Sequence, residues 1–188
     1  MHEVPAMIRW VLWLLAGLLL GGIVHFVTIL YLPNTATQNA YTKISDISPV
    51  NKIVPLPAPT AGKAVVPLMD PAFAAAVCRY DLKESPLKLT TPVSLAYTSV
   101  TFYTNKDIAY YAINDRAAGR RTIELDLMTA AQRAQLPDDE EISAADRLIV
   151  ESPTQTGLIV LRALAPEPGM MPAAVSSLSG ARCQPFTP

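Results

Sequence analysis

Histidine is almost absent from this sequence of 188 residues. The two histidines are His2 and His25, one in a short N-terminal tail and one inside an apolar run. The rest of the chain therefore lacks the imidazole that a Ser-His-Asp or Cys-His catalytic set requires and that zinc and iron sites usually contain. The sequence also lacks the GxGxxG and GxxxxGK(S/T) patterns of dinucleotide and P-loop sites. We expect no metal and no cofactor.

A basic excess is missing too. The sequence has 15 Lys and Arg against 16 Asp and Glu, which gives a net charge of −1. A nucleic-acid-binding protein normally carries additional cations that replace phosphate counterions, so we expect no nucleic acid among the partners. The one dense carboxylate run, Asp138-Asp139-Glu140-Glu141, lacks the alternating ligand spacing and central glycine of a calcium loop. We interpret it as a solvated loop or the start of a helix.

What the sequence does contain is one long apolar run. Residues 10–32 are 23 residues without Asp, Glu, Lys or Arg. A helix needs about 20 apolar residues to cross the hydrocarbon core of a membrane, and Trp10, Trp13 and Tyr31 lie toward the two interfaces. A cleaved signal peptide is the alternative, but the run exceeds the usual ~7–15 residues and no small-x-small cleavage site follows it. We predict a retained transmembrane helix.

The apolar run divides the chain into four parts. We predict a cytoplasmic tail at 1–9, the transmembrane helix at 10–32, a proline-rich spacer partly packed on the domain at 33–69, and an extracytoplasmic β-rich domain at 70–188. Arg9 and the amino terminus lie on the short side of the helix, where positive charge favours the cytoplasm. We therefore expect the C-terminal domain on the side of the membrane away from the cytoplasm.

The helix carries one pattern that suggests pairing. Gly17 and Gly21 form a GxxxG, and His25 continues the same helical face. Small residues let two helices approach closely, and a polar side chain that faces a partner avoids exposure to lipid. Besides the lipid bilayer, we therefore expect a membrane protein partner or a homodimer at this face. Chance occurrence of GxxxG in an apolar segment is the alternative.

Cysteine is nearly as scarce as histidine. Cys78 and Cys183 are the two cysteines, and they lie 105 positions apart, near the two ends of the predicted domain. An even pair beyond a membrane anchor is typical of an oxidising compartment. In the chain-entropy model, a disulfide that closes a loop of about 100 residues contributes roughly 4.7 kcal/mol. We predict this disulfide, with two unrelated buried thiols as the alternative.

Beyond the apolar run, short strands dominate the pattern, because 17 prolines interrupt the chain. Strands are predicted at 87–90, 95–103, 108–113, 122–127, 148–151 and 158–164. Polar turns at 104–107 and 154–157 predict two hairpins. Short helices are predicted at 70–78, 129–136 and 173–181. The fold class is therefore α+β: an N-terminal transmembrane helix, then a small β-rich domain with an antiparallel sheet and two or three short helices.

One loop has the composition of an anion site. Asn114, Asp115, Arg116 and Arg120 lie between two predicted strands, in the stretch Ile113–Arg121. Guanidinium groups offer paired donors to a carboxylate or phosphate, so we consider these four residues candidate ligand-binding residues. The alternative is that Asp115 and one arginine brace the loop while the other arginines lie on the surface.

Four segments carry a resemblance to a known family: FAAAVCRYDL (73–82), SVTFY (99–103), AINDRAAGRR (112–121) and VESPT (150–154). With the single anchor, they resemble the small bacterial membrane proteins of the domain-of-unknown-function 1254 family. The pattern is also similar to that of larger β-rich proteins with the same domain. The resemblance implies a bacterial envelope setting and a β-rich fold. The expected location is therefore the bacterial inner membrane, with the C-terminal domain in the periplasm. It implies no reaction, substrate or catalytic residue.

These patterns favour a non-catalytic interaction or ligand-binding module, fixed by its anchor at the outer face of the inner membrane. The alternative is an enzyme or binder that acts on a small anionic ligand through the Asn114–Arg121 loop. In that case Asp115, Arg116 and Tyr110 or Tyr111 would supply the acid-base and binding groups. Packing of the tyrosines in a sheet is the competing interpretation of their alternation.

Overall fold

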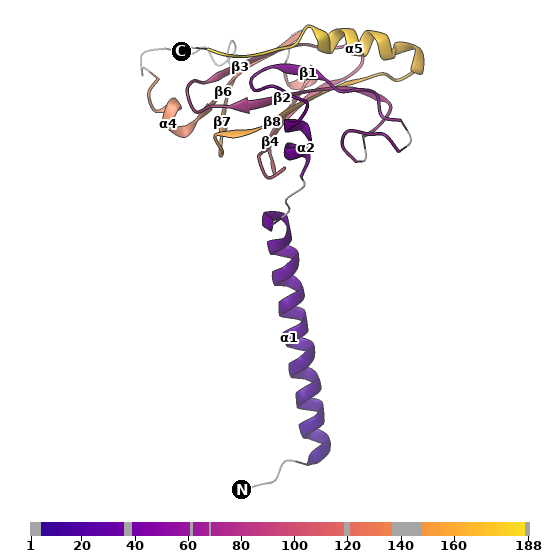
Figure 1. Cartoon of the computed structure of the whole chain (residues 1–188), viewed down its shortest axis with the longest axis vertical. Helices are drawn as coiled ribbons and strands as arrows, with labels where there is room; N and C mark the ends of the chain where they lie inside the picture. Colours follow the sequence, from indigo (N-terminus) through magenta and orange to yellow (C-terminus); the bar gives the residue numbers. More distant parts are fainter. Residues whose placement is uncertain are drawn as a thin grey trace. The chain divides into compact units, whose positions relative to one another are not determined.

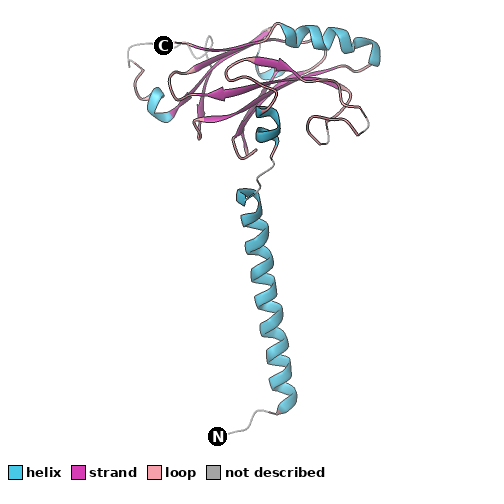
Figure 2. Cartoon of the chain, in the orientation of Figure 1, coloured by secondary structure: helices cyan, strands magenta, loops and turns pink. Residues whose placement is uncertain are grey.

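The computed structural model describes residues 5–35, 39–60, 62–67, 69–118, 121–136 and 148–186. The chain separates into two units, residues 1–37 and residues 38–188. Figure 1 follows the chain from the long helix α1 in indigo to the C-terminal segment in yellow. Figure 2 shows that the second unit consists of strands joined by loops, with short helices between them.

The first unit contains α1 (Ala6–Thr35), the helix that the apolar run predicts. Its span Ala6–Leu32, 27 residues, is long and apolar enough to cross a membrane, and no part of its apolar window is buried in the structure. A helix that is apolar on every side requires apolar surroundings. A membrane anchor and an N-terminal signal sequence both fit this description.

The second unit is built on two β-sheets. The first is antiparallel throughout, in the order β1-β2-β8-β4-β5. Its strands are β1 (Ile53–Pro55), β2 (Phe73–Asp81), β8 (Thr156–Leu164), β4 (Thr98–Thr104) and β5 (Ala109–Asn114). The second has the order β7-β6-β3-β9, with β6 and β7 parallel. Its strands are β7 (Leu148–Ser152), β6 (Thr122–Thr129), β3 (Leu87–Pro92) and β9 (Arg182–Pro185). The predicted β-rich α+β fold with an antiparallel sheet is confirmed.

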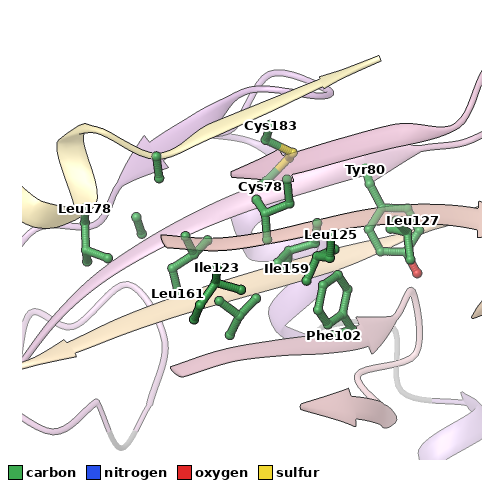
Figure 3. Packing of buried hydrophobic residues seen from close by; sticks show 14 of the residues in the cluster. Cys78, Tyr80, Phe102, Ile123, Leu125, Leu127, Ile159, Leu161, Leu178 and Cys183 are labelled. Atoms are coloured by element: carbon green, nitrogen blue, oxygen red, sulfur yellow. A yellow bond between two sulfur atoms is a disulfide. The ribbon is translucent and has the colours of Figure 1, made fainter. Parts of the chain in front are cut away.

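The main core lies between the inner faces of the two sheets. Side chains alternate between the faces of a strand, and along β4 Val100 and Phe102 are completely buried. Figure 3 shows Phe102 of the first sheet together with Leu125 and Leu127 of β6 in the second sheet, all members of one cluster. The prediction of strand β4 is confirmed, and its inward residues are those that alternation selects.

The predicted helix at residues 70–78 is wrong, because this stretch starts the nine-residue strand β2. Its alanines have high helix propensity, but propensity gives way to pairing with strands on both sides, β1 and β8. Small side chains suit a strand that is covered on both faces. Asp70 does not cap a helix; its carboxylate accepts a hydrogen bond from the Ala72 amide at 2.9 Å in a local turn.

The two predicted hairpins have opposite outcomes. The one at 104–107 is confirmed: β4 pairs with β5, and Asp107 adopts a positive φ of 59° in the turn. The one at 154–157 is wrong. Strands β7 and β8 flank that turn but belong to different sheets, because β7 pairs with β6 whereas β8 pairs with β2 and β4. The turn therefore carries the chain from one sheet to the other.

Short helices surround the sheets: α2 (Ala40–Ser45), α3 (Asp115–Ala118), α4 (Ala130–Arg133), the 3-10 turn η1 (Pro168–Met170) and α5 (Met171–Ser179). Two of them confirm predictions. Thr129 caps α4 through the Gln132 amide, and α5 leads into β9, which carries Cys183. Helix α2 lies in the predicted spacer and was not expected. The carboxylate run 138–141 lies outside the described residues.

The two cysteines meet across the core. Cys78 lies on β2 and Cys183 on β9, so the pair links the first sheet to the second. Their sulfur atoms are 1.92 Å apart and their Cα atoms 6.5 Å apart, which is disulfide distance. Both residues are buried, and Figure 3 shows the bond between them. The disulfide therefore links the two sheets through residues that are 105 positions apart in the sequence.

A tyrosine cluster forms a second link between the sheets. The Tyr80 hydroxyl of β2 lies 3.1 Å from the Tyr110 hydroxyl of β5 and 3.0 Å from the Ser152 hydroxyl at the end of β7. It also donates to the Tyr103 carbonyl at 3.3 Å. Tyr80 is completely buried, and a buried hydroxyl requires such partners. We call Tyr80, Tyr110 and Ser152 the hydroxyl cluster.

Gly157 is the residue that makes room for this cluster. A Cβ atom at this position would overlap the Tyr103 carbonyl oxygen and the Tyr80 hydroxyl, and a backbone carbonyl within a sheet cannot move aside. We therefore predict that Gly157→Ala lowers the free energy of unfolding by at least about 1–3 kcal/mol, the typical cost of overpacking a core. Urea unfolding of the full chain measures the change. Gly169→Ala is the matched control, since its Cβ would meet nothing within 4 Å; equal effects of the two variants would contradict the assignment.

Tyr110 should make the domain sensitive to alkali. Burial, with the adjacent Tyr80, raises the pKa of Tyr110 well above its ordinary value. A raised pKa means that the folded state keeps a proton that the unfolded state releases. Stability is therefore complete below pH about 10, the ordinary tyrosine pKa, and decreases as the pH rises beyond it. Tyr110→Phe should weaken this alkaline loss in urea unfolding, whereas Tyr41→Phe, outside the hydroxyl cluster, should leave it unchanged. An identical alkaline loss in wild type and Tyr110→Phe would refute the prediction.

Candidate functional site

A groove of about 320 Å³ lies on the outer face of the first sheet, opposite the main core. Its floor comes from β2, β8 and β4: Ala75, Val77, Leu158, Val160, Arg162 and Tyr103. Its walls come from α2 and from the segment that follows β1, including Ile44, Leu56 and Val66. Small-molecule sites are mostly apolar hollows of about 300–1,000 Å³, so this groove falls at the lower end of that range.

Strand register arranges the floor in rows across the sheet. In one row Val160 lies between Val77 and Thr101, and in the next Arg162 lies between Ala75 and Ser99. Directly paired residues point to the same face of a sheet. The groove therefore has an apolar middle formed by the valines, next to a row that contains an arginine.

We call α2 and the segment that follows β1, which together form the walls of the groove, the cover. The cover packs on the floor in a small cluster separate from the main core: Ile44 of α2 packs with Val77 and Leu158, and Leu56 and Val66 pack against the same cluster. Main-chain bonds attach the cover to β2: the Leu56 amide donates to the Ala75 carbonyl at 2.9 Å and the Asn51 amide to the Arg79 carbonyl at 2.8 Å. The cover is thus fixed along the edge of the sheet.

The start of α2 is attached at the β4–β5 turn. The Asp107 carboxylate accepts hydrogen bonds from the amides of Ala40 at 2.6 Å and Tyr41 at 3.1 Å. A carboxylate at a helix N-terminus satisfies amides that have no partner in the helix. The Asn39 side chain adds a bond to the Asn105 carbonyl at 2.8 Å. Asp107 lines the groove, but its charge is used to hold the cover.

The predicted anion loop lies beyond the groove. Asn114 ends β5, Asp115 begins α3, and Arg116 is exposed on the same short helix. Arg120 lies outside the described residues. The groove lining contains none of Asn114, Asp115 and Arg116. One oxygen of the Asp115 carboxylate is buried without a hydrogen-bond partner among the described residues, so the structure shows no bracing of this oxygen by an arginine.

The two tyrosines of the alternative enzyme hypothesis are partly buried and pack against the core. A bulge between Phe102 and Tyr103 shifts the pairing of β4 with β5, and a bulge lets two consecutive side chains turn to one face. Tyr110 and Tyr111 therefore both contact Phe102, with ring centres 6.1 and 5.8 Å away. Burial raises the pKa of Tyr111 as well as that of Tyr110. A raised pKa keeps a phenol protonated, which is unfavourable for a general base.

The candidate pairing face lies on α1. Around Gly17 and Gly21 an added Cβ would meet nothing within 4 Å, so their surface is open in the described unit. Thr28 donates its hydroxyl to the Val24 carbonyl at 2.8 Å and has no need of a partner helix. The His25 ring lies 6.3 Å from that of Phe26. The open glycine surface is compatible with the predicted pairing of Gly17, Gly21 and His25, which stays a prediction.

Metal-binding residues do not gather in the part of the chain that the structure describes. No group of three His, Cys, Asp or Glu side chains there has the arrangement to hold a metal ion.

The groove was not predicted, although the sequence carries a signal for it. Leu158 to Leu161 are apolar without alternation, and an unbroken apolar run indicates a strand that is covered on both faces. Arg162 directly follows that run.

Comparison with known proteins identifies the family. The family model described as "Protein of unknown function (DUF1254)" matches residues 50–185. The fold is similar to the crystal structure of the VPA0106 protein from Vibrio parahaemolyticus, with a TM-score of 0.57, 12% identity, and coverage of 78% of this chain and 34% of that chain. A second similarity is to an uncharacterized protein from Burkholderia cenocepacia, with a TM-score of 0.45, 10% identity, and coverage of 73% and 34%.

These two chains are longer than the present one, which spans about a third of each (34%). Among curated proteins, none matches the sequence. The similarity to the Vibrio protein concerns the fold, because only 12% of residues are identical. The family match covers more than half of the chain and includes all four segments on which the resemblance was based. The chain therefore belongs to the DUF1254 family of proteins of unknown function.

Proposed function

We propose that this chain is a single-pass membrane protein whose domain lies at the outer face of the bacterial inner membrane and binds a small, largely apolar ligand without catalysing a reaction. The observation that carries the binding role is the groove on the first sheet, an apolar hollow of about 320 Å³ with one arginine in its floor. Its walls belong to a cover whose ends are held by specific hydrogen bonds. A site of this kind positions a ligand but offers no nucleophile with an adjacent base.

Three observations support the location. Helix α1 is long and apolar enough to cross a membrane, and the Cys78–Cys183 pair at disulfide distance is typical of a compartment where disulfides persist. The short N-terminal side carries Arg9, as positive-inside topology favours. With α1 retained, the domain would remain close to the outer leaflet and to other membrane components.

A second candidate site is the loop that begins at Asn114. The observation in its favour is the buried oxygen of Asp115, which lacks a hydrogen-bond partner among the described residues. A buried carboxylate oxygen without a donor is unusual and is sometimes a functional group. The groove is nevertheless the better supported site, because its concave shape and lining are formed by described residues.

The location is tested by protease access in cells. A C-terminal tag on the full chain should be removed when protease is added to spheroplasts, because the domain is exposed outside the cytoplasmic membrane. Intact mass should show the chain with α1 attached, and the tagged protein should sediment with membranes. A cytoplasmic protein that remains intact is the control for leakage. A tag protected until lysis, or a processed domain in the soluble periplasmic fraction, would overturn the proposed anchoring or orientation.

The binding role is tested by filling the groove. Val160→Trp places a large ring on the floor between Val77 and Thr101, whereas Ala112→Trp places it on an exposed position of β5 that does not line the groove. The full chain is isolated in nanodiscs, and bound small molecules are extracted and identified by mass spectrometry. We expect wild type and Ala112→Trp to retain compounds that Val160→Trp loses. The same compounds on all three proteins would exclude the groove as the binding site.

A further inference from the structure

Arg162 is the cation in the groove that lacks a partner. It lines the groove, and its neighbours in register are Ala75 and Ser99, neither of which is a carboxylate. No ion pair or hydrogen bond of its side chain occurs within the described part of the domain. Opposite charges commonly face each other across strands. Arg162 has no such neighbour and is exposed to solvent, so its donors are accessible to a ligand in the groove.

Two other cations, Lys88 and Arg133, are arranged differently. Lys88 of β3 pairs directly with Asp126 of β6 in register, and its ammonium lies 4.0 Å from that carboxylate and 3.7 Å from Glu124. Arg133 lies 3.4 Å from Glu151. These strand and helix cations therefore have carboxylate partners provided by the chain itself. Arg162 differs from them because its row provides none.

The two carboxylates that line the groove are already engaged. Asp107 accepts two amide hydrogen bonds from the start of α2. Asp70 accepts one from the Ala72 amide at 2.9 Å, and it is exposed to solvent, where its charge is screened. Neither lies within ion-pair distance of Arg162 among the described residues. What the groove lacks is therefore an acceptor for the guanidinium.

Rows of different polarity follow one another along the groove. The row of Arg162 continues through Ser99 to Asn114 of β5, so it is a polar row, and Phe73 lines the groove on its far side. The next row contains Val77 and Val160, and the following one pairs Leu158 with Arg79, which does not line the groove. Rows on one face repeat every two residues, or about 6.6–6.8 Å along a strand. A ligand that contacts both Arg162 and the apolar lining has an anionic end and an extended apolar body.

We propose that the groove binds a single-chain anionic amphiphile, with its carboxylate or phosphate on Arg162 and its aliphatic chain over Val160 and Val77 toward Leu158. This inference rests on the proposed function of the groove as a binding site. Guanidinium forms paired hydrogen bonds with either anion, and the apolar rows remove methylene groups from water. A volume of about 320 Å³ suits one short chain rather than a lipid with two chains.

The test uses three photoreactive probes of equal chain length, each with a diazirine at the methyl end: an alkyl carboxylic acid, an alkyl phosphate and an alcohol. The full chain is held in nanodiscs of zwitterionic lipid, and labelled peptides are mapped by mass spectrometry. With the anion on Arg162, the label should appear in the peptide that contains Leu158. We expect at least one anionic probe to label it about tenfold more than the alcohol does, the effect of one charge-assisted contact.

Variants at Arg162 distinguish the effect of its charge on probe binding from the effect of its paired hydrogen-bond donors. Arg162→Gln should remove the preference for the anionic probe, and Arg162→Lys should keep part of it, because lysine retains the charge but not the paired donors. Arg182→Gln, an exposed arginine of β9 on the second sheet, is the matched control and should change nothing. Far-UV circular dichroism and the melting temperature confirm that each variant is folded.

The outcomes distinguish the ligand class from the binding role. A stronger signal for the acid identifies a fatty-acid-like ligand, and a stronger signal for the phosphate identifies a lysolipid-like headgroup; both support the proposal. Equal labelling of the groove by acid, phosphate and alcohol overturns the anionic class but leaves the groove as an apolar site. Label confined to α1, or a preference for the anionic probe that persists in Arg162→Gln, overturns the proposal. The binding function of the groove is tested separately, by the extraction experiment with Val160→Trp.

Discussion

Strands β2 and β8 are the paired centre of the first sheet, and both must be covered on two faces. Their inward residues, including Cys78 and Ile159, enter the main core, while Val77 and Leu158 on the other face enter a second cluster. The second sheet covers only the inner face of these strands. The segment from Ala40 to Val66 covers the outer face, so this segment is part of the fold and does more than connect the domain to α1.

The two coverings are held by different chemistry. The inner one is linked through β2 itself: Cys78 bonds to Cys183 of the second sheet, and Tyr80, two residues further on the same face, joins the hydroxyl cluster. The outer one depends on amide and carboxylate hydrogen bonds at Asp107 and along the edge of β2. A disulfide and buried hydroxyls link the inner interface, whereas the outer one combines a small apolar cluster with partly buried hydrogen bonds around a partly open groove.

Much of this fold follows from sequence patterns, and the errors have physical causes. Alternation identified β4, and a polar turn identified its hairpin with β5. The alanines of 73–76 suggested a helix because local propensity does not record pairing partners, and only the neighbouring strands β1 and β8 make this stretch a strand. Likewise, a four-residue polar turn at 154–157 looks the same whether it joins two paired strands or connects two sheets.

The candidate site shows the same division between local and nonlocal information. The loop at Asn114–Arg121 stands out in sequence because its charges are adjacent, whereas the groove combines residues from Ala40 to Arg162 that no local pattern connects. Even so, the two are related by register, because Asn114 and Arg162 belong to one row on the same face, separated by Ser99. The polar loop that the sequence emphasises therefore begins in the row of the groove arginine. That arginine was the better local signal, because it interrupts an apolar strand, is exposed at the groove and has no carboxylate partner among the described residues.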